Sequence, residues 1–138
     1  MANRFRLPTT FGRRLEDLGV STHAVLRRAG LPLGLFAQSR IWLTTEEMSA
    51  LYSSIQEISG DPAIGLKLGS EERSEYFSPI AISALYSRSF RDALNRIARY
   101  KRLTSPQEIR IVERGKECAV EFVWLLAEMA EAPIWIDM

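Results

Sequence analysis

Apolar residues between positions 48 and 58 recur at spacings of three and four, which is the period of an α-helix. They are Met48, Leu51, Tyr52, Ile55 and Ile58. Thr44 and Glu47 precede this run at the spacing of a capping box, in which each side chain bonds a backbone N–H of the other residue. The pattern predicts a long helix after Thr44 that buries its apolar stripe in a core, which explains the stripe better than contact with a cofactor.

The same helix is predicted to end at a corner that leads at once into a second, short helix. Gly60 can adopt the left-handed conformation that terminates helices. Asp61 is expected to cap the next helix, with Pro62 at its first position and Gly69 at its end. The residues of this structural motif are Gly60, Asp61, Pro62, Gly65 and Gly69. Its glycines are spaced too regularly for a phosphate-binding loop, so the motif indicates architecture rather than chemistry.

Two shorter helices are predicted near the N-terminus, and together they resemble a helix-turn-helix. The first follows Pro8 and stops at Gly19, and the second is capped by Ser21 and stops at Gly30. The side chains available to DNA on the second helix are His23, Arg27 and Arg28. A helical pair with a glycine-containing turn is also a common packing unit. A small DNA-binding module using residues 19–30 therefore stays open as an alternative.

Two further helices are predicted after a polar segment at residues 70–75, which is interpreted as a solvated loop. One begins at Pro79 behind a Ser78 cap, and the other runs from Phe90 to about Leu103 behind a Ser89 cap. The first of these helices carries Ile82, Leu85 and Tyr86. The side chains of the second that are expected to face inward are Phe90, Ala93, Leu94, Ile97 and Tyr100. These helices extend the predicted helical bundle.

The last of these helices is strongly basic. Its cations are Arg88, Arg91, Arg96, Arg99, Lys101 and Arg102, against the single acid Asp92. Such a run is typical of a solvated helix face, and it also suits contacts with phosphates, with glutamates of the polar segment or with a ligand carboxylate.

After residue 107 the apolar period changes from helical to two. Ile109 and Ile111 alternate with charged residues, and Gly115 suits a tight turn. The apolar side of the second strand is formed by Cys118, Val120, Phe122 and Trp124. The pattern predicts a β-hairpin with one polar and one apolar face. Cys118 lies on the apolar face, so a buried, inert thiol is expected.

These elements predict a mostly helical α+β fold, a bundle of short helices followed by a β-hairpin. The 138 residues are enough for one domain. The apolar segment at residues 133–138 ends abruptly, which indicates a truncated domain. A net charge of +1 gives no argument for a nucleic-acid or membrane partner. A single cysteine and the lack of a signal sequence or membrane span favour a cytoplasmic protein.

The sequence holds no recognisable catalytic or metal-binding set. There is one histidine, His23, and one cysteine, Cys118, on elements of different type. No nucleophile motif, phosphate loop, dinucleotide fingerprint or zinc spacing occurs. An enzyme is therefore not expected, and neither a cofactor nor a metal is predicted.

Four blocks in this order resemble a known family. They are Leu26–Pro32, Ser59–Gly69, Ser89–Leu94 and Ala98–Leu103. The arrangement is similar to the N-terminal, arabinose-binding-type domain of AraC/XylS-family transcription regulators. The resemblance implies a cytoplasmic bacterial regulator whose residues 1–138 form a single sensor and dimerisation domain. The rest of that domain and a C-terminal DNA-binding domain with two helix-turn-helix units would lie outside this chain.

Under this interpretation the chain binds an unidentified small effector, forms a homodimer and touches DNA only through the absent C-terminal domain. A pocket is expected between the apolar face of the hairpin and the helices, where an arginine would suit a carboxylated effector. The candidate ligand-binding residues are Tyr52, Arg99, Phe122 and Trp124. A protein-interaction domain without a ligand is the other alternative.

Overall fold

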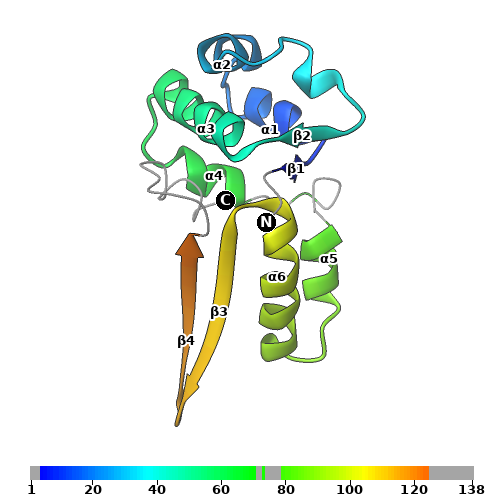
Figure 1. Ribbon diagram of the computed structural model, residues 1–138, viewed down its shortest axis with the longest axis vertical. Helices are drawn as coiled ribbons and strands as arrows, with labels where there is room; N and C mark the ends of the chain where they lie inside the picture. Colours follow the sequence, from blue (N-terminus) through cyan, green and yellow to red (C-terminus); the bar gives the residue numbers. More distant parts are fainter. Residues whose placement is uncertain (1–3, 71–72, 74–78, 125–138) are drawn as a thin grey trace. The chain divides into compact units, whose positions relative to one another are not determined.

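The computed structural model describes residues 4–70, 73 and 79–124 (Figure 1). Their contacts divide the chain into two compact units, the first containing residues 4–70 and the second residues 73 and 79–124. Both contain helices together with one antiparallel pair of strands. The predicted class, a mostly helical α+β fold with several short helices, is confirmed. The polar segment and the Ser78 cap fall largely outside the described residues.

The first unit combines four α-helices with two very short strands. Its elements are β1 (Phe5–Leu7), α1 (Phe11–Asp17), α2 (Thr22–Ala29), the 3₁₀ turn η1 (Leu35–Ala37), β2 (Ile41–Leu43), α3 (Thr45–Ser59) and α4 (Ile64–Gly69). The strands are antiparallel, with Phe5 opposite Leu43 and Leu7 opposite Ile41. Sequence patterns missed both strands, because three residues are too few to show a period.

The predicted helix ends are confirmed where a side chain caps them. The Ser21 Oγ accepts from the backbone N–H of Ala24 at 3.2 Å, and Gly30 closes α2 in the left-handed conformation. Thr44 and Glu47 form the complete capping box of α3, with distances of 3.2 and 2.8 Å. Local side-chain chemistry thus sets these boundaries before any packing is considered.

The corner after α3 differs in one respect from the prediction. Gly60 is left-handed, with φ of 59°. Asp61, however, does not cap a helix that begins at Pro62. Its Oδ1 accepts from the N–H of Ala63 at 2.9 Å, and the Ile64 N–H bonds the Asp61 carbonyl at 3.1 Å, so a turn is inserted first. The helix α4 therefore starts at Ile64, because the Asp61 side chain stabilises a turn two residues long rather than a cap.

The hydrophobic core of the first unit surrounds α3. Met48, Leu51, Tyr52 and Ile55 are buried as predicted, whereas Ile58 at the helix end is 40% exposed. Other buried side chains come from every neighbouring element and include Phe5, Leu7, Leu15, Val25, Leu26, Leu35, Ile41, Leu43 and Ile64. The amphipathic stripe of α3 is thus the central element of this core.

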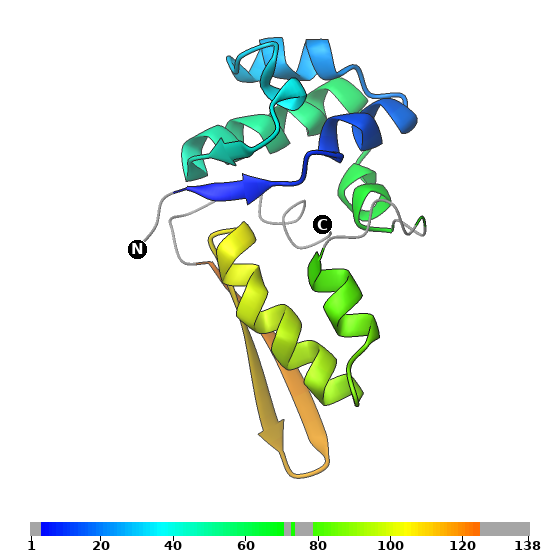
Figure 2. The same cartoon turned by 90° about the vertical axis from the view of Figure 1, so that its right-hand side faces the viewer.

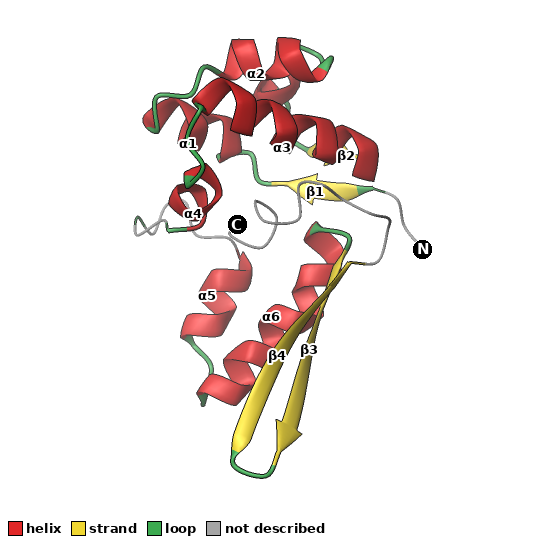
Figure 3. Ribbon diagram, turned by 90° about the vertical axis from the view of Figure 1, so that its left-hand side faces the viewer, coloured by secondary structure: helices red, strands yellow, loops and turns green. Residues whose placement is uncertain are grey.

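The second unit contains two antiparallel helices and the hairpin. Its elements are α5 (Pro79–Leu85), α6 (Phe90–Thr104), β3 (Gln107–Arg114) and β4 (Glu117–Trp124). Figure 2 shows α5 and α6 side by side, and Figure 3 shows α6 running beside the hairpin. Ile109 pairs with Phe122 and Ile111 with Val120, and Gly115 occupies the turn with φ of 60°. The predicted hairpin and its turn are confirmed.

Several burial predictions for this unit are wrong. Cys118 is exposed rather than buried, and two side chains expected to face inward, Phe90 and Tyr100, are 80% and 41% exposed. In and directly after α5, for which no burial was predicted, Ile82, Leu85 and Tyr86 are exposed as well. Periodicity identifies an apolar face but cannot tell whether another element covers it. Among the described residues of this unit, α6 covers only part of the hairpin.

Only one of the two hydrogen bonds of the predicted α6 capping box forms. The Ser89 Oγ accepts from the Asp92 N–H at 3.1 Å, but Asp92 reaches the N–H of Arg88 rather than that of Ser89. This hydrogen bond lowers the pKa of Asp92, with a smaller contribution from Arg96. The helix still begins at Phe90 as predicted.

Candidate functional site

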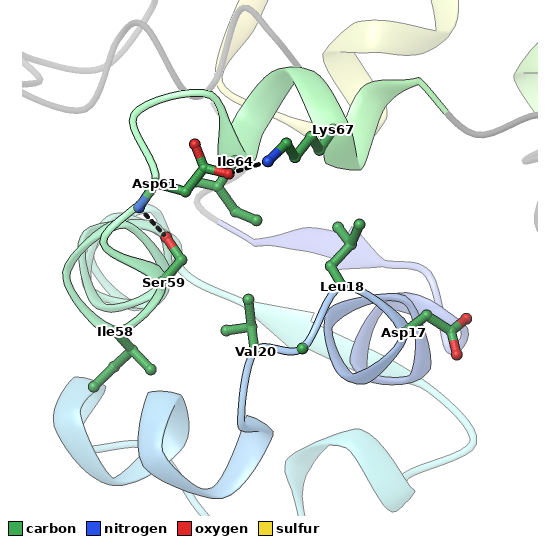
Figure 4. A pocket seen from close by; sticks show the side chains of 9 residues that line it. Asp17, Leu18, Val20, Ile58, Ser59, Asp61, Ile64 and Lys67 are labelled. Carbon is green, nitrogen blue, oxygen red and sulfur yellow. Dashed lines mark hydrogen bonds and ion pairs between the residues drawn. The ribbon is translucent and has the colours of Figure 1, made fainter.

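An open cleft of about 410 Å³ lies in the first unit, between the α1–α2 turn and the corner that joins α3 to α4 (Figure 4). The residues that line it are Asp17, Leu18, Gly19, Val20, Ile58, Ser59, Asp61, Ile64 and Lys67. Figure 4 shows the side chains of Leu18, Val20 and Ile64 directed toward a common space. The volume falls in the range of small-molecule sites.

Two left-handed glycines give the cleft its walls. Gly19 turns the chain out of α1 with φ of 77°, and Gly60 turns it out of α3. Each reversal directs the following residues back toward the other wall, which places Val20 and Ile64 at the base. The cleft is therefore a consequence of two helix ends whose positions the sequence predicts.

The polar side of the cleft is an ordered network around Asp61. The Lys67 ammonium donates to the Asp61 carboxylate, and the Asp61 N–H donates to the Ser59 hydroxyl at 3.3 Å. Arg14 donates to the Lys67 carbonyl at 2.8 Å. The hydrogen bonds from Lys67 and Ala63 hold the pKa of Asp61 below its usual value. The carboxylate is thus charged and engaged, so a ligand would meet a neutralised ion pair beside an apolar base.

Of the four predicted ligand residues, Tyr52 lies in the core of the first unit. Its side chain is 4% exposed and meets the ring of Phe11 edge-on, with ring centroids 6.3 Å apart. Burial raises the pKa of its phenol well above the usual range. A buried, uncharged tyrosine packed on Phe11 supports the core of this unit.

The other three predicted residues, Arg99, Phe122 and Trp124, belong to the second unit. Arg99 is exposed on α6, and Phe122 is 44% exposed on β4. Trp124 ends β4, opposite Gln107 in the strand register. The amide of Gln107 is buried and has no hydrogen-bond partner among the described residues. Sequence reasoning did not single out Gln107, because neither periodicity nor a motif marks a polar residue at a strand start.

The basic character of α6 is partly balanced within its own unit. Arg91 pairs with Glu113 at 2.8 Å, Arg96 with Asp92 at 3.2 Å, and Arg102 with Glu108 at 2.5 Å. These exposed pairs favour the interpretation of a solvated helix face. Among the described residues, the glutamates that engage α6 come from the hairpin, and those of the polar segment lie outside the described residues.

The helix-turn-helix alternative rests on α2, whose His23, Arg27 and Arg28 are all exposed. Arg28 pairs with Glu57 of α3 at 2.7 Å. The buried side of α2 is formed by Val25 and Leu26. This helix is thus fastened to α3, and its outer face carries the three side chains that the alternative requires.

The first unit thus combines a buried apolar core with an open cleft. Within residues 4–70, 73 and 79–124, no three histidine, cysteine or carboxylate side chains come close enough to hold a metal ion. Of the helices described, none is both long and apolar enough to cross a membrane.

The class of protein comes from comparison with known families. The family model for the N-terminal arabinose-binding domain of AraC transcription regulators matches residues 19–136, and the chain belongs to this family. It is a ligand-sensing domain of an AraC-type transcription regulator, and the family is one of regulator domains rather than of enzymes. No curated protein gives a significant match to the chain.

Proposed function

We propose that this chain is the sensor and dimerisation domain of a bacterial AraC-type regulator and works in the cytoplasm as a homodimer. Binding of a small effector would change the population of domain arrangements and so the DNA affinity of a separate C-terminal helix-turn-helix domain. The family match over residues 19–136 is the observation that carries this proposal. No cofactor is required for such a switch.

Of the residues that the sequence indicated for ligand binding, Arg99, Phe122 and Trp124 belong to the second unit, and the effector is proposed to contact these three, whereas Tyr52 is 4% exposed in the core of the first unit. Arg99 supports a carboxylated effector, because its guanidinium is exposed and has no ion-pair partner among the described residues. Phe122 offers an exposed aromatic ring on the same unit. The cleft beside Asp61 and Lys67 is a second candidate position for the effector, supported by its volume.

The experiment that tests effector sensing measures promoter binding by the full-length regulator. A panel of carboxylated metabolites and sugars is first screened by thermal shift. A ligand at 100 times its Kd stabilises the folded state by about 2.7 kcal/mol, which is easily detected. The hit must then change promoter affinity at fixed salt. A panel that neither stabilises the regulator nor changes its promoter binding contradicts sensing of these ligand classes.

The two candidate positions are separated by variants. If Arg99 holds the effector, Arg99→Ala weakens binding about tenfold or more, whereas Arg13→Ala on the exposed side of α1 leaves it unchanged. If the cleft holds the effector, Lys67→Met produces the loss and Arg99→Ala does not. Titration calorimetry with each purified variant gives the affinity directly.

The alternatives make different predictions for the same protein. A DNA-binding module at residues 19–30 requires that this chain alone bind duplex DNA with steep salt dependence, and that Arg27→Ala with Arg28→Ala abolish the binding. An interaction domain without a ligand requires dimers that no effector modulates. Either result would replace the sensor proposal.

A further inference from the structure

The cleft of the first unit has an aliphatic base. Its apolar lining consists of Leu18, Val20, Ile58 and Ile64. Val20 and Ile64 are almost fully buried, whereas Ile58 is 40% exposed. None of the nine described residues that line the cleft is aromatic. The base therefore suits an aliphatic group, because burial of apolar surface favours any apolar group that fits the space.

The hydroxyl group of the cleft is already engaged. The Ser59 Oγ donates to the Gln56 carbonyl at 3.3 Å and accepts from the Asp61 N–H at 3.3 Å. A sugar carries many hydroxyls, and each one that is desolvated without a partner weakens binding. The lining therefore favours a ligand with an aliphatic chain over a polyhydroxylated one.

Asp61 and Lys67 form an ion pair that a ligand can readily open. The Lys67 ammonium donates to the Asp61 Oδ2, and the side chains of Lys67 and Asp61 are 55% and 29% exposed. Exposed pairs of this kind contribute little to stability. The Asp61 Oδ1 accepts from the Ala63 N–H at 2.9 Å, so the carboxylate is held in place even when Lys67 moves away. Lys67 can follow a ligand, because its ammonium is carried on a flexible chain.

We propose that the cleft binds a zwitterionic aliphatic amino acid. Its ammonium pairs with Asp61, its carboxylate pairs with Lys67, and its side chain lies on the aliphatic base. The inference rests on the proposed function, in which this cleft is one of two candidate positions, and it names the chemical class of the effector. Figure 4 shows Asp61 and Lys67 beside Ile64, so the charged pair adjoins the aliphatic base. A zwitterion replaces one ion pair by two, and neither protein charge loses its partner.

The charges of the lining disfavour a ligand that carries one charge only. Asp17 and Asp61 are the acids of the lining, and Lys67 is its base. A carboxylate without an ammonium would enter beside an excess of negative charge and draw Lys67 away from Asp61. An amine without a carboxylate would displace Lys67 and offer its ammonium no new partner. A ligand with both charges satisfies both residues.

Four matched ligands test this class by titration calorimetry on the full-length regulator. L-leucine carries both charges and an aliphatic side chain. Isocaproate lacks only the ammonium, isoamylamine lacks only the carboxylate, and glycine lacks only the side chain. L-leucine is expected to bind about tenfold or more tightly than each of the others. If isocaproate or isoamylamine bound as tightly as leucine, the zwitterionic class would be overturned.

Two variants assign each ligand charge to a residue. Lys67→Met is expected to weaken leucine binding about tenfold but not isoamylamine binding, because the amine has no carboxylate to lose a partner. Asp61→Asn keeps an oxygen for the Ala63 N–H and is expected to weaken leucine but not isocaproate. Lys116→Met, at an exposed position between β3 and β4, is the control and leaves every affinity unchanged. Loss of all ligands alike in either variant would indicate a structural role and overturn the assignment.

A third variant tests the aliphatic base. Ile58→Ala removes a lining side chain at the end of α3 and is expected to weaken leucine binding severalfold. Leu66→Ala removes a side chain of α4 that is 58% exposed and outside the lining, and it is expected to bind leucine normally. Circular dichroism and thermal melts check that both variants are folded. Unchanged leucine binding by folded Ile58→Ala would overturn the contact.

The results separate this inference from the proposed function. If leucine, valine and isoleucine do not bind but another effector binds and changes promoter affinity, the ligand class is overturned and effector sensing stands. If leucine binds with the expected dependence on Asp61 and Lys67 but leaves promoter affinity unchanged, the ligand class is supported and sensing through the cleft is contradicted. A regulator that binds none of the ligands overturns both.

Discussion

At residue 60 the backbone adopts a conformation that L side chains other than asparagine rarely tolerate. Gly60 has φ of 59°, and a Cβ there would meet no atom within 4 Å, so only the backbone conformation opposes a substitution. Gly34 has the same open surroundings but φ of −87°. The pair therefore separates conformational strain from crowding.

Gly60→Ala is expected to lower the free energy of unfolding by about 1 kcal/mol, because the left-handed backbone conformation is sterically unfavourable for a residue with a Cβ atom. Gly60→Asn is expected to lose less, and Gly34→Ala is expected to be neutral or slightly stabilising. Urea denaturation of the three variants measures the differences. Equal effects at positions 60 and 34 would contradict the left-handed corner.

The stability of the fold is predicted to depend on pH through the carboxyl group of Asp61. The hydrogen bonds from Lys67 and Ala63 depress the pKa of its carboxyl in the folded state. A depressed pKa stabilises the fold above the ordinary aspartate range and loses this contribution as the pH falls through the folded value. The stability difference between wild type and Asp61→Asn is therefore expected to be largest above the ordinary aspartate pKa and to decrease as the pH falls below it. Thermal melts of both proteins across this range measure it, and a constant difference would refute the assignment.

Among the elements, α3 is the helix whose boundaries are most fully specified. A capping box begins it and a left-handed glycine ends it. The half-formed box of α6 offers a contrast, because Asp92 bonds Arg88 instead of the cap residue. Caps satisfy N–H groups that have no partner within the helix.

Thr44→Ala is expected to cost about 1 kcal/mol of stability through loss of the α3 cap. Thr44→Ser retains the hydroxyl and is expected to restore most of the loss. Chemical denaturation monitored by circular dichroism measures both. If serine proved as damaging as alanine, packing of the threonine methyl rather than capping would be responsible.

At the scale of the whole molecule, the two units differ in how much apolar surface they bury. Apart from Pro106, every buried aliphatic or aromatic side chain, as far as the chain is described, comes from residues 5–68. The helices and strands of the second unit instead expose large apolar residues, including Leu85, Phe90 and Leu103. The free energy of folding is therefore expected to depend mainly on the first unit.

Two leucine truncations test this distribution. Leu51→Ala removes a fully buried side chain of α3 and is expected to destabilise the protein by about 2–5 kcal/mol. Leu103→Ala removes one that is 64% exposed on α6 and is expected to change stability by less than about 1 kcal/mol. Urea denaturation compares them. A large loss at Leu103 would show that another surface covers it in solution.

Features set by interactions between neighbouring residues were predicted from the sequence, whereas features set by contacts between distant residues were not. Ser21, Thr44 and Gly60 act within four residues of themselves, and their caps were predicted correctly. Asp61 also acts locally, but a turn and a cap use the same side chain, and the sequence did not distinguish them. The strands β1 and β2 lie more than thirty residues apart, and each is too short to show a pattern.

The candidate site was likewise predicted only where it depends on neighbouring residues. The two helix ends that enclose the cleft were predicted, but their proximity was not, because it depends on how α1 and α3 pack. Cys118 was expected to be buried on an apolar face, yet it is exposed, because α6 covers only part of the hairpin in the described chain. The placement of Tyr52 in a core was predicted from its stripe, whereas its proposed contact with an effector is untested.

By itself, the amino-acid sequence determined the helices, their caps, the hairpin and the family to which the chain belongs, because periodicity, capping and motif order are properties of neighbouring residues. Only the tertiary structure decided which apolar faces are covered, where Asp61 and Lys67 meet across the corner, and that a cleft opens between two helix ends. Burial depends on contacts between residues far apart in the chain, and no local pattern encodes these.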